Sequence, residues 1–314
     1  MAQRTHYYET DADQFQLSGA EKLSEEAYYA EYHGHAVTHL HQVLHTVRGE
    51  TRRPAIYLVG DSTMDNKYWL PSRGRAALNG YENLFDKMKP DVAYFVNKYC
   101  TASKKIGDHF CINAAIEEST LNDRPGSTLM SHDIFVRDTI QPNDVLICSV
   151  GGNDIALKPT CGTVFNISLL LNLNTMGMIE SGYSVGLSHF IRLFKDETTN
   201  YLKKLCEKNK PKVILVCCIY YLDEKPGGSW ADRVLQMLGY DSNPAKLQLC
   251  IRKIFEFATS KIEIEGTTVV PVPMFKYLDG KNTRDYVQRV EPSIGGGEKL
   301  GKAFVEYIEE AISV

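Results

Sequence analysis

Short apolar runs alternate along the chain with longer stretches in which apolar residues recur at helical spacing. The runs are the length of strands and rich in β-branched residues, which predicts buried β-strands. They cover residues 55–60, 109–116, 144–154, 212–221 and 267–273. The helical stretches cover residues 81–89, 187–209, 244–266 and 297–312. Because continuous apolar strands that alternate with helices form parallel sheets covered on both faces, we expect a three-layer α/β/α sandwich around a five-stranded parallel sheet.

Three segments lie outside this alternation. Residues 1–50 are expected to form an N-terminal helical arm that packs on a single α/β domain spanning residues 51–314. Residues 155–185 and 222–243 are insertions that follow strand ends. Loops at the carboxyl ends of parallel strands often cover a binding site, so we expect these insertions to cover a pocket. The alternative is that they only pack beside the core.

The composition sets limits on partners and location. The chain has 314 residues, 43% of them hydrophobic, and a formal net charge of −4, so nothing indicates a nucleic-acid partner. We expect no membrane span, because no apolar stretch is long enough. The N-terminus lacks the apolar core of a signal peptide, which favours a cytoplasmic location. The eight cysteines contain no C-x-x-C pair and are expected to be reduced and mostly buried. The oligomeric state stays open.

Polar residues gather where the predicted strands end. Gly60-Asp61-Ser62 follows the first strand, "INAAIEES" (112–119) closes the second, and Gly151-Gly152-Asn153-Asp154 closes the third. "VEPSIGGGEKLG" (290–301) stands just before the last helix. In this order, the four stretches resemble the sequence blocks of the SGNH, or GDSL, hydrolase superfamily over roughly residues 54–312. The resemblance implies a flavodoxin-like sandwich and hydrolysis of a small-molecule ester or acyl substrate.

The resemblance also implies roles for individual residues. Ser62 would be the nucleophile. The backbone N–H of Ser62, the backbone N–H of Ala115 and the side-chain amide of Asn153 would form the oxyanion hole. Supporting positions would be Gly60, Asp61 and Asp154. No cofactor is implied. The histidine pairs of residues 33–45 could share a helix face, but without the glutamate of an H-E-x-x-H motif we expect no metal site.

The sequence departs from the family where the general base is expected. The family's histidine position is occupied by Glu291, Gln288 stands three residues earlier, and no histidine follows His189. Asp285, six residues before Glu291, is the candidate acid of this block, although no standard register places it beside an imidazole. The candidate catalytic residues are therefore Ser62, Glu291 and Asp285.

Three explanations of this departure stay open. Burial and nearby carboxylates can raise the pKa of Glu291 enough for it to act as the base. A histidine from elsewhere could replace it: His189 begins a helix after the first insertion, whereas His109 and His132 precede strands and belong to the opposite edge of the sheet. Alternatively, catalysis is impaired or lost, and the pocket binds an acyl or carbohydrate ligand. A further interpretation is that the protein is a scaffold and that Gly60-Asp61-Ser62 is only a turn.

Overall fold

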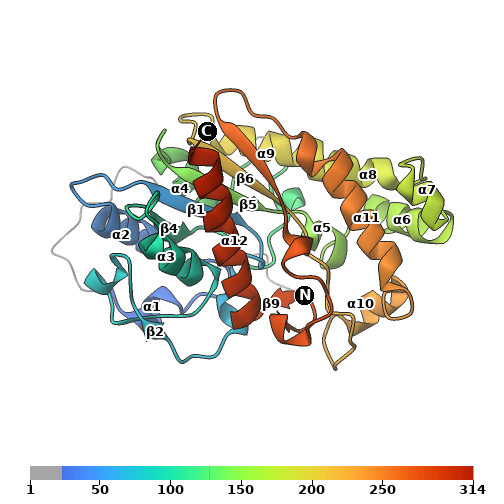
Figure 1. Ribbon diagram of the computed structural model, residues 1–314, viewed down its shortest axis with the longest axis horizontal. Helices are drawn as coiled ribbons and strands as arrows, with labels where there is room; N and C mark the ends of the chain where they lie inside the picture. The colour runs from blue at the N-terminus through green and yellow to red at the C-terminus, as the bar shows by residue number, and fades with distance from the viewer. Residues whose placement is uncertain (1–22, 127, 314) are drawn as a thin grey trace.

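The computed structural model describes residues 23–126 and 128–313, and its centre is a parallel sheet of five strands (Figure 1). The strands, in spatial order, are β4 (Phe110–Asn113), β1 (Ala55–Gly60), β5 (Val145–Ser149), β6 (Val213–Cys218) and β7 (Thr268–Pro273). Numbered along the chain, this is the 2-1-3-4-5 order of flavodoxin-like folds. The predicted fold class is therefore confirmed. The order reverses between β1 and β5, and ligands of such sheets bind at that reversal, outside the carboxyl ends of the strands.

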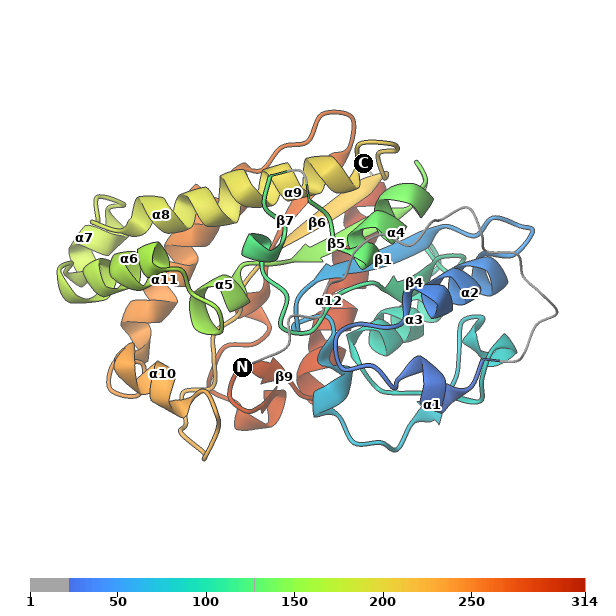
Figure 2. The same ribbon diagram turned by 180° about the vertical axis from the view of Figure 1, so that it is seen from behind.

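Helices cover both faces of the sheet, as Figures 1 and 2 show. One face carries α3 (Val92–Ala102) and α12 (Ile294–Ile312). The other carries α2 (Val37–Arg48), α4 (Ser131–Thr139), α9 (Thr198–Leu205) and α11 (Pro244–Phe257). Side chains of a strand alternate between the two faces. In β1, Tyr57 and Val59 accordingly join the larger apolar cluster, and Ile56 and Leu58 join the second cluster, beneath α3 and α12.

The smaller elements lie mostly in the loops around the sheet. The remaining helices are α1 (Glu25–Tyr28), α5 (Gly152–Ala156), α6 (Cys161–Asn172), α7 (Met176–Glu180), α8 (Leu187–Ile191) and α10 (Asp232–Met237). A π-helical turn, η5 (Arg192–Glu197), joins α8 to α9. The 3-10 turns are η2 (Asn66–Trp69), η3 (Tyr81–Asn83), η4 (Leu121–Asp123), η6 (Thr259–Lys261), η7 (Met274–Lys276) and η8 (Thr283–Asp285). Two small hairpins pair β2 (Arg75–Ala76) with β3 (Lys87–Met88), and β8 (Tyr286–Val287) with β9 (Glu291–Pro292).

Three of the four predicted helices are present, but the prediction of a helix over residues 81–89 is wrong. That stretch forms the turn η3 and the strand β3. Tyr81, Leu84, Phe85 and Met88 are all buried, so the helical spacing identified the buried side chains and not the backbone conformation. Helix α3 was not predicted. It packs against β4 and α12 and is buried on most sides. Its sequence therefore lacks the polar face by which a surface helix is predicted.

Of the predicted N-terminal arm, residues 1–22 lie outside the described part of the structure. The rest comprises α1 and α2, and α2 contributes Leu40, Val43, Leu44 and Val47 to the apolar core. Within the described residues, no helix is both long enough and apolar enough to cross a membrane. All eight cysteines are free, and all but Cys161 are buried.

Gly60 ends β1 in a conformation that only glycine adopts easily. Its φ is +122°, and a Cβ atom there would lie 1.7 Å from the carbonyl oxygen of Ser149 on the neighbouring strand β5. This close approach lets the chain turn sharply toward Ser62 without separating β1 from β5.

We expect Gly60→Ala to lower the free energy of unfolding by at least about 2 kcal/mol, because the strained backbone and the steric clash both oppose the native turn. Urea denaturation would measure the change. Gly227→Ala is the matched control, since no atom lies within 4 Å of a Cβ built there. Equal stability of the two variants would contradict this account of the turn.

Candidate active site

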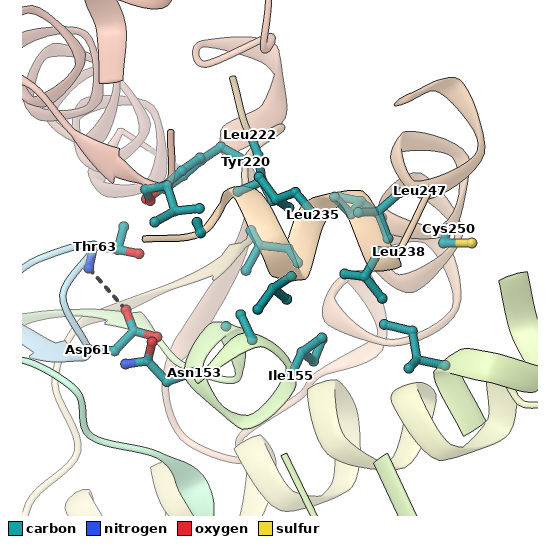
Figure 3. A pocket seen from close by; sticks show the side chains of 18 of the residues that line it. Asp61, Thr63, Asn153, Ile155, Tyr220, Leu222, Leu235, Leu238, Leu247 and Cys250 are labelled. Carbon is teal, nitrogen blue, oxygen red and sulfur yellow. Dashed lines mark hydrogen bonds between the residues drawn. The ribbon is translucent and has the colours of Figure 1, made fainter. Parts of the chain in front are cut away.

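Ser62 lies in a tight turn directly after β1. The turn is closed by hydrogen bonds from the N–H groups of Met64 and Asp65 to the Asp61 carbonyl, both 3.0 Å, and from the Thr63 N–H to the Asp61 carboxylate, 3.1 Å (Figure 3). Within the described part of the chain, the Ser62 N–H donates to no protein acceptor. The turn therefore presents both the hydroxyl and the amide hydrogen of Ser62 to a ligand.

Glu291 is the partner of the Ser62 hydroxyl. Ser62 Oγ donates to Glu291 Oε1 at 3.2 Å, across 229 residues of sequence. Glu291 begins strand β9 and is 4% exposed, and its Oε2 atom accepts no hydrogen bond. Burial, reinforced by the negative charges of Asp61 and Asp65, raises the pKa of Glu291 to about 8, although the hydrogen bond from Ser62 opposes the shift. The Glu291 carboxyl group therefore holds a proton more readily than a glutamate in water does.

Asn153 stands on the first turn of α5, after Gly151, which has a φ of +99°. One hydrogen of its side-chain amide is donated to the carbonyl of Ser119 at 3.1 Å. Asn153 and Ser62 line the same two cavities.

Asp154 ties α5 to the loop that follows β4. Its carboxylate accepts the backbone N–H of Leu121 at 2.9 Å, and the backbone N–H and side-chain amide of Asn122 at 3.1 and 2.8 Å. These contacts fix the loop that carries Ser119, the acceptor for Asn153. The supporting role expected for Asp154 stays a prediction.

The backbone N–H of Ala115 is already engaged. It donates to the side-chain oxygen of Asn113 at 3.1 Å, and Ala115 lines neither cavity that contains Ser62. The same loop offers another amide. Glu118 has a φ of +60°, lines a cavity with Ser62 and Asn153, and its N–H donates to no acceptor among the residues the structure describes. The structure therefore places Glu118, which sequence reasoning missed, in a cavity that Ser62 lines and Ala115 does not.

Asp285 is not brought to the Ser62–Glu291 pair. Its carboxylate forms an ion pair with Lys299 on α12 and accepts the side-chain amide of Asn282 at 2.9 Å. It lines neither cavity that contains Ser62. Its contacts fix the start of the β8–β9 hairpin, since the Ser293 N–H donates to the Asp285 carbonyl at 2.9 Å.

The histidines weighed as alternative bases are engaged elsewhere. His132 Nε2 lies 2.6 Å from the carbonyl of His35, and burial lowers the pKa of His132 to about 4. His189 Nε2 lies 3.1 Å from the hydroxyl of Thr163, and His109 Nδ1 lies 2.7 Å from the carboxylate of Asp108. Across residues 23–126 and 128–313, no imidazole is hydrogen-bonded to Ser62.

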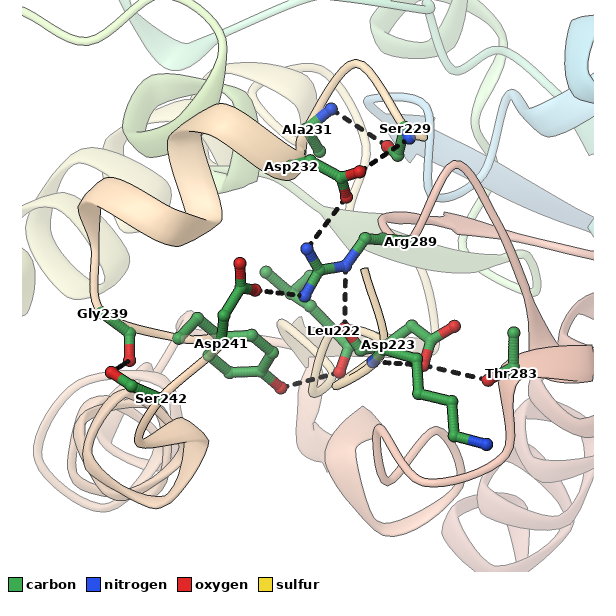
Figure 4. Close-up of polar contacts among 12 residues, drawn as sticks. Leu222, Asp223, Ser229, Ala231, Asp232, Gly239, Asp241, Ser242, Thr283 and Arg289 are labelled. Atoms are coloured by element: carbon green, nitrogen blue, oxygen red, sulfur yellow. Dashed lines mark hydrogen bonds and ion pairs between the residues drawn. The ribbon is translucent and has the colours of Figure 1, made fainter. Parts of the chain in front are cut away.

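Arg289 holds the hairpin that carries Glu291. The buried guanidinium pairs with Asp232 at 2.9 Å and Asp241 at 2.8 Å, and its Nε donates to the carbonyl of Asp223 at 3.1 Å (Figure 4). All three partners belong to the insertion 222–243. Glu291 is therefore positioned by an element that has no part in the central sheet.

A second buried carboxyl group, Glu117, stands beside the pair. It is 2% exposed, Trp69 Nε1 donates to its Oε1 atom at 3.1 Å, and its Oε2 atom has no partner. Burial, together with the charge of Glu291, raises the pKa of Glu117 to about 9. Burial and mutual repulsion therefore favour the protonated forms of these carboxyl groups more than water does.

Asp65 joins the N-terminal arm to these loops. Its Oδ2 atom accepts the N–H groups of Gly34 and Glu117, both at 2.8 Å, and its Oδ1 atom pairs with the buried Lys67 at 2.6 Å. Lys67 also donates to the carbonyl of Tyr32 at 3.4 Å. One carboxylate thereby fixes both Glu117 and the part of the arm that carries Tyr32.

An apolar cavity extends from Ser62 between the insertions and α11 (Figure 3). Asp61, Ser62, Asn153 and Glu291 form its polar end. Most of the wall is aliphatic and includes Ile155, Ile167 and Leu170 from the first insertion, Leu222, Val234, Leu235 and Leu238 from the second, and Leu247, Ile251 and Ile254 from α11. Its volume is about 110 Å³, against roughly 10–15 Å³ for one water by a comparable measure. Both insertions therefore cover a pocket, as their positions indicated.

A second cavity is also lined by Ser62 and is called the polar cleft below. Its lining residues are Tyr32, Ser62, Trp69, Glu117, Glu118, Asn153, Leu157, Trp230 and Glu291. The two cavities share Ser62, Asn153, Trp230 and Glu291. Among residues 23–126 and 128–313, no group of three or more His, Cys, Asp or Glu side chains is arranged to hold a metal ion.

No family model matches the sequence, and no curated protein matches it. Similar solved structures exist. A structure described as that of a GDSL-like lipase from Parabacteroides merdae has a TM-score of 0.44 and 16% identity, covering 81% of this chain and 94% of its own. An acetyl xylan esterase variant from Geobacillus stearothermophilus has a TM-score of 0.41 and 15% identity over 81% and 94% of the two chains. A carbohydrate acetylesterase from Sinorhizobium meliloti has a TM-score of 0.41 and 12% identity over 82% and 99%.

TM-scores of 0.41–0.44 at 12–16% identity carry no argument about substrate or catalysis. The roles of individual residues therefore rest on the geometry of the site.

The raised pKa values make a prediction about stability. A carboxyl group whose pKa is higher in the folded than in the unfolded protein stabilises the fold fully below its unfolded pKa, and this contribution is lost as pH rises through the folded pKa. For Glu117 the window runs from the ordinary value of 4.5 to about 9. We expect Glu117→Gln to flatten the fall in unfolding free energy between pH 5 and 9 by at least about 1 kcal/mol.

Urea denaturation at several pH values would measure this. Glu118→Gln is the control, because the neighbouring Glu118 side chain is 35% exposed. An unchanged pH slope in Glu117→Gln would show that Glu117 is ionised in the folded protein.

Proposed function

We propose that the protein is a serine hydrolase of esters, with Ser62 as nucleophile and Glu291 as general base. The observation that carries the proposal is the hydrogen bond from Ser62 Oγ to Glu291 Oε1, 3.2 Å long, formed where an apolar cavity and a polar cleft meet. A hydroxyl directed at a buried base, beside unengaged amide hydrogens, is the arrangement that acyl transfer needs.

The reaction would proceed in two stages. The Ser62 oxygen attacks the ester carbonyl while its proton passes to the Glu291 carboxylate. The tetrahedral intermediate collapses, the alcohol leaves with that proton, and the acyl group remains on Ser62. Water then loses a proton to Glu291 and attacks the acyl-enzyme, which releases the acid and restores the serine.

The oxyanion would be held by three donors on two loops and the serine turn. These are the N–H of Ser62, the free amide hydrogen of Asn153 and the N–H of Glu118. Ala115, the donor expected from the sequence, stays a less favourable candidate because its N–H is donated to Asn113. Loss of one such donor typically costs about 3 kcal/mol of transition-state stabilisation.

A second candidate function is ligand binding without turnover. The observation that favours it is the pKa of Glu291, about 8, together with the engagement of His132 and His189 elsewhere. At neutral pH most Glu291 side chains would carry a proton and could not accept another. The pH dependence of any activity separates the two candidates.

We expect Ser62→Ala to lose hydrolysis of p-nitrophenyl acetate. In the wild type, kcat/KM should rise with pH and level off above about 8, because only the ionised form of Glu291 accepts the serine proton. Glu291→Gln should lower kcat at least about 100-fold. A fluorophosphonate probe should label the wild type and not Ser62→Ala.

Glu291→His combined with Gln288→Asp is the matched test of the base. Restored turnover with a pH midpoint near that of imidazole, about 6.5, would assign the base role to position 291. Absence of labelling and turnover in the wild type at pH 9 would favour the binding function.

The apolar cavity is the proposed acyl-binding side of the site. It is walled by aliphatic side chains and ends at Ser62, so an acyl chain would lie along it with its carbonyl carbon at the serine. Both insertions contribute to this wall, and the chain length accepted would depend on how far they leave it open.

We expect Leu238→Trp to reduce kcat/KM for p-nitrophenyl octanoate at least about 10-fold and to leave that for the acetate within about twofold, because the indole would occupy space needed only by the longer chain. Met237→Trp is the control, since Met237 is 70% exposed and lies outside the wall. Equal losses for both esters would contradict the assignment of the cavity to the acyl chain.

A further inference from the structure

The polar cleft has a composition unlike that of the apolar cavity on the other side of Ser62. Three aromatic residues, Tyr32, Trp69 and Trp230, line it together with the carboxyl groups of three glutamates, Glu117, Glu118 and Glu291. No Lys, Arg or His is among the residues that line the cleft in the described structure. The leaving group of an ester bound at Ser62 would lie here, because the acyl chain occupies the other side.

Two of the carboxyl groups are buried without full hydrogen bonding. Glu117 is 2% exposed and Glu291 4% exposed, and the Oε2 atom of each has no partner. A buried polar atom without a partner costs about 1–3 kcal/mol, so the cleft is incomplete as it stands. A cation bound among these groups would favour their ionised forms, which burial disfavours.

The basic side chains near the cleft already have other partners. Lys67 pairs with Asp65 at 2.6 Å. Lys158 donates to the carbonyl of Glu118 at 2.9 Å and lies 3.9 Å from Asp123. His33 lies 3.5 Å from Glu118 at the edge of the cleft. Within the described part of the chain, none of these groups contacts Glu117 or Glu291 by a hydrogen bond or ion pair.

The field of the carboxyl groups acts on Tyr32. Its phenol has a raised pKa, first because of burial and then because of the negative charges of Glu117 and Glu118. The indole of Trp69 is oriented by its hydrogen bond to Glu117. Aromatic faces attract cations, and combined with carboxylates they form the usual recognition site for quaternary ammonium groups.

We propose that the polar cleft binds an organic cation of the quaternary ammonium type, and that the substrate is an ester of an apolar acid with a cationic alcohol. The part of this inference that concerns the substrate rests on the proposed function. The cation site itself does not, since it can be tested in a variant that lacks the nucleophile.

The two tryptophans provide the measurement. Trp69 and Trp230 are the only tryptophans in the chain, and both line the cleft. In Ser62→Ala, we expect choline to change the intrinsic fluorescence saturably. Its neutral isostere, 3,3-dimethyl-1-butanol, should bind about threefold to thirtyfold more weakly, because it lacks the attraction between a cation and an aromatic face.

Matched substitutions locate the site. Trp230→Leu and Glu117→Gln in the Ser62→Ala background should each weaken choline binding at least about threefold, measured by calorimetry. Tyr183→Leu and Glu298→Gln are the controls, because both residues lie outside the cleft and Tyr183 is 87% exposed. Equal binding of choline and the neutral alcohol, or equal effects of site and control substitutions, would overturn the proposal. So would saturable binding of Mg²⁺ or Ca²⁺ in preference to choline.

Kinetics of the wild type separate the two proposals. Butyrylcholine should be hydrolysed with a kcat/KM at least about threefold above that of 3,3-dimethylbutyl butyrate, mainly through a lower KM. Choline binding without hydrolysis of either ester would overturn the proposed function and leave the cation site standing. Hydrolysis of both esters at the same kcat/KM, with no response to choline, would overturn the cation site alone.

Discussion

The site depends on keeping one carboxyl group away from water. The base role proposed for Glu291 requires that burial raise its pKa, since an ordinary glutamate in water is too weak a base to take a proton from a serine. That burial is costly, and other contacts must offset it. The β8–β9 hairpin is held in place by Arg289 and its ion pairs with Asp232 and Asp241. The chemistry proposed for Ser62 is therefore linked to the insertion 222–243, which lies outside the central sheet.

The two cavities give the site opposite characters on its two sides. Aliphatic residues from both insertions and α11 line one side, and aromatic residues and carboxyl groups line the other. They meet where Ser62, Asn153 and Glu291 stand, so a molecule that fits both sides must carry its reactive bond near the boundary between an apolar and a polar part. Trp230 lines both cavities, which makes the segment 222–243 the shared wall.

Much of this arrangement can be read from the sequence. The five apolar runs predicted the five strands of the sheet, because strands buried on both faces are apolar throughout. Ser62 and Asn153 were proposed from their places at strand ends and from the resemblance to the GDSL hydrolases, and both line the same two cavities. The sequence was less informative where the outcome depends on backbone conformation. Ala115 was expected to donate to the oxyanion, but the preceding Asn113 side chain takes its hydrogen, a competition that spacing does not reveal.

Other residues were missed because they come from separate parts of the chain. Tyr32 reaches the polar cleft from the N-terminal arm and Trp230 from an insertion, and no motif links them. The adjacent acids Glu117 and Glu118 follow a buried strand, a signal that could have drawn attention to them. Asp285 was included from its proximity in sequence to Glu291, yet its contact with Lys299 on α12 turns it toward the helix.

The hydrogen bond between residues 62 and 291 also bears on how the protein is made. Ribosomes release the amino-terminal part of a chain first, so the nucleophile emerges while the hairpin that completes its surroundings has yet to be translated. Ser62 would remain without this hydrogen-bond partner until residue 291 had been synthesised. A nascent chain could therefore assemble β1, β4 and β5 before the pair forms, and the proposed reactivity toward esters would be acquired only once the β8–β9 hairpin had folded.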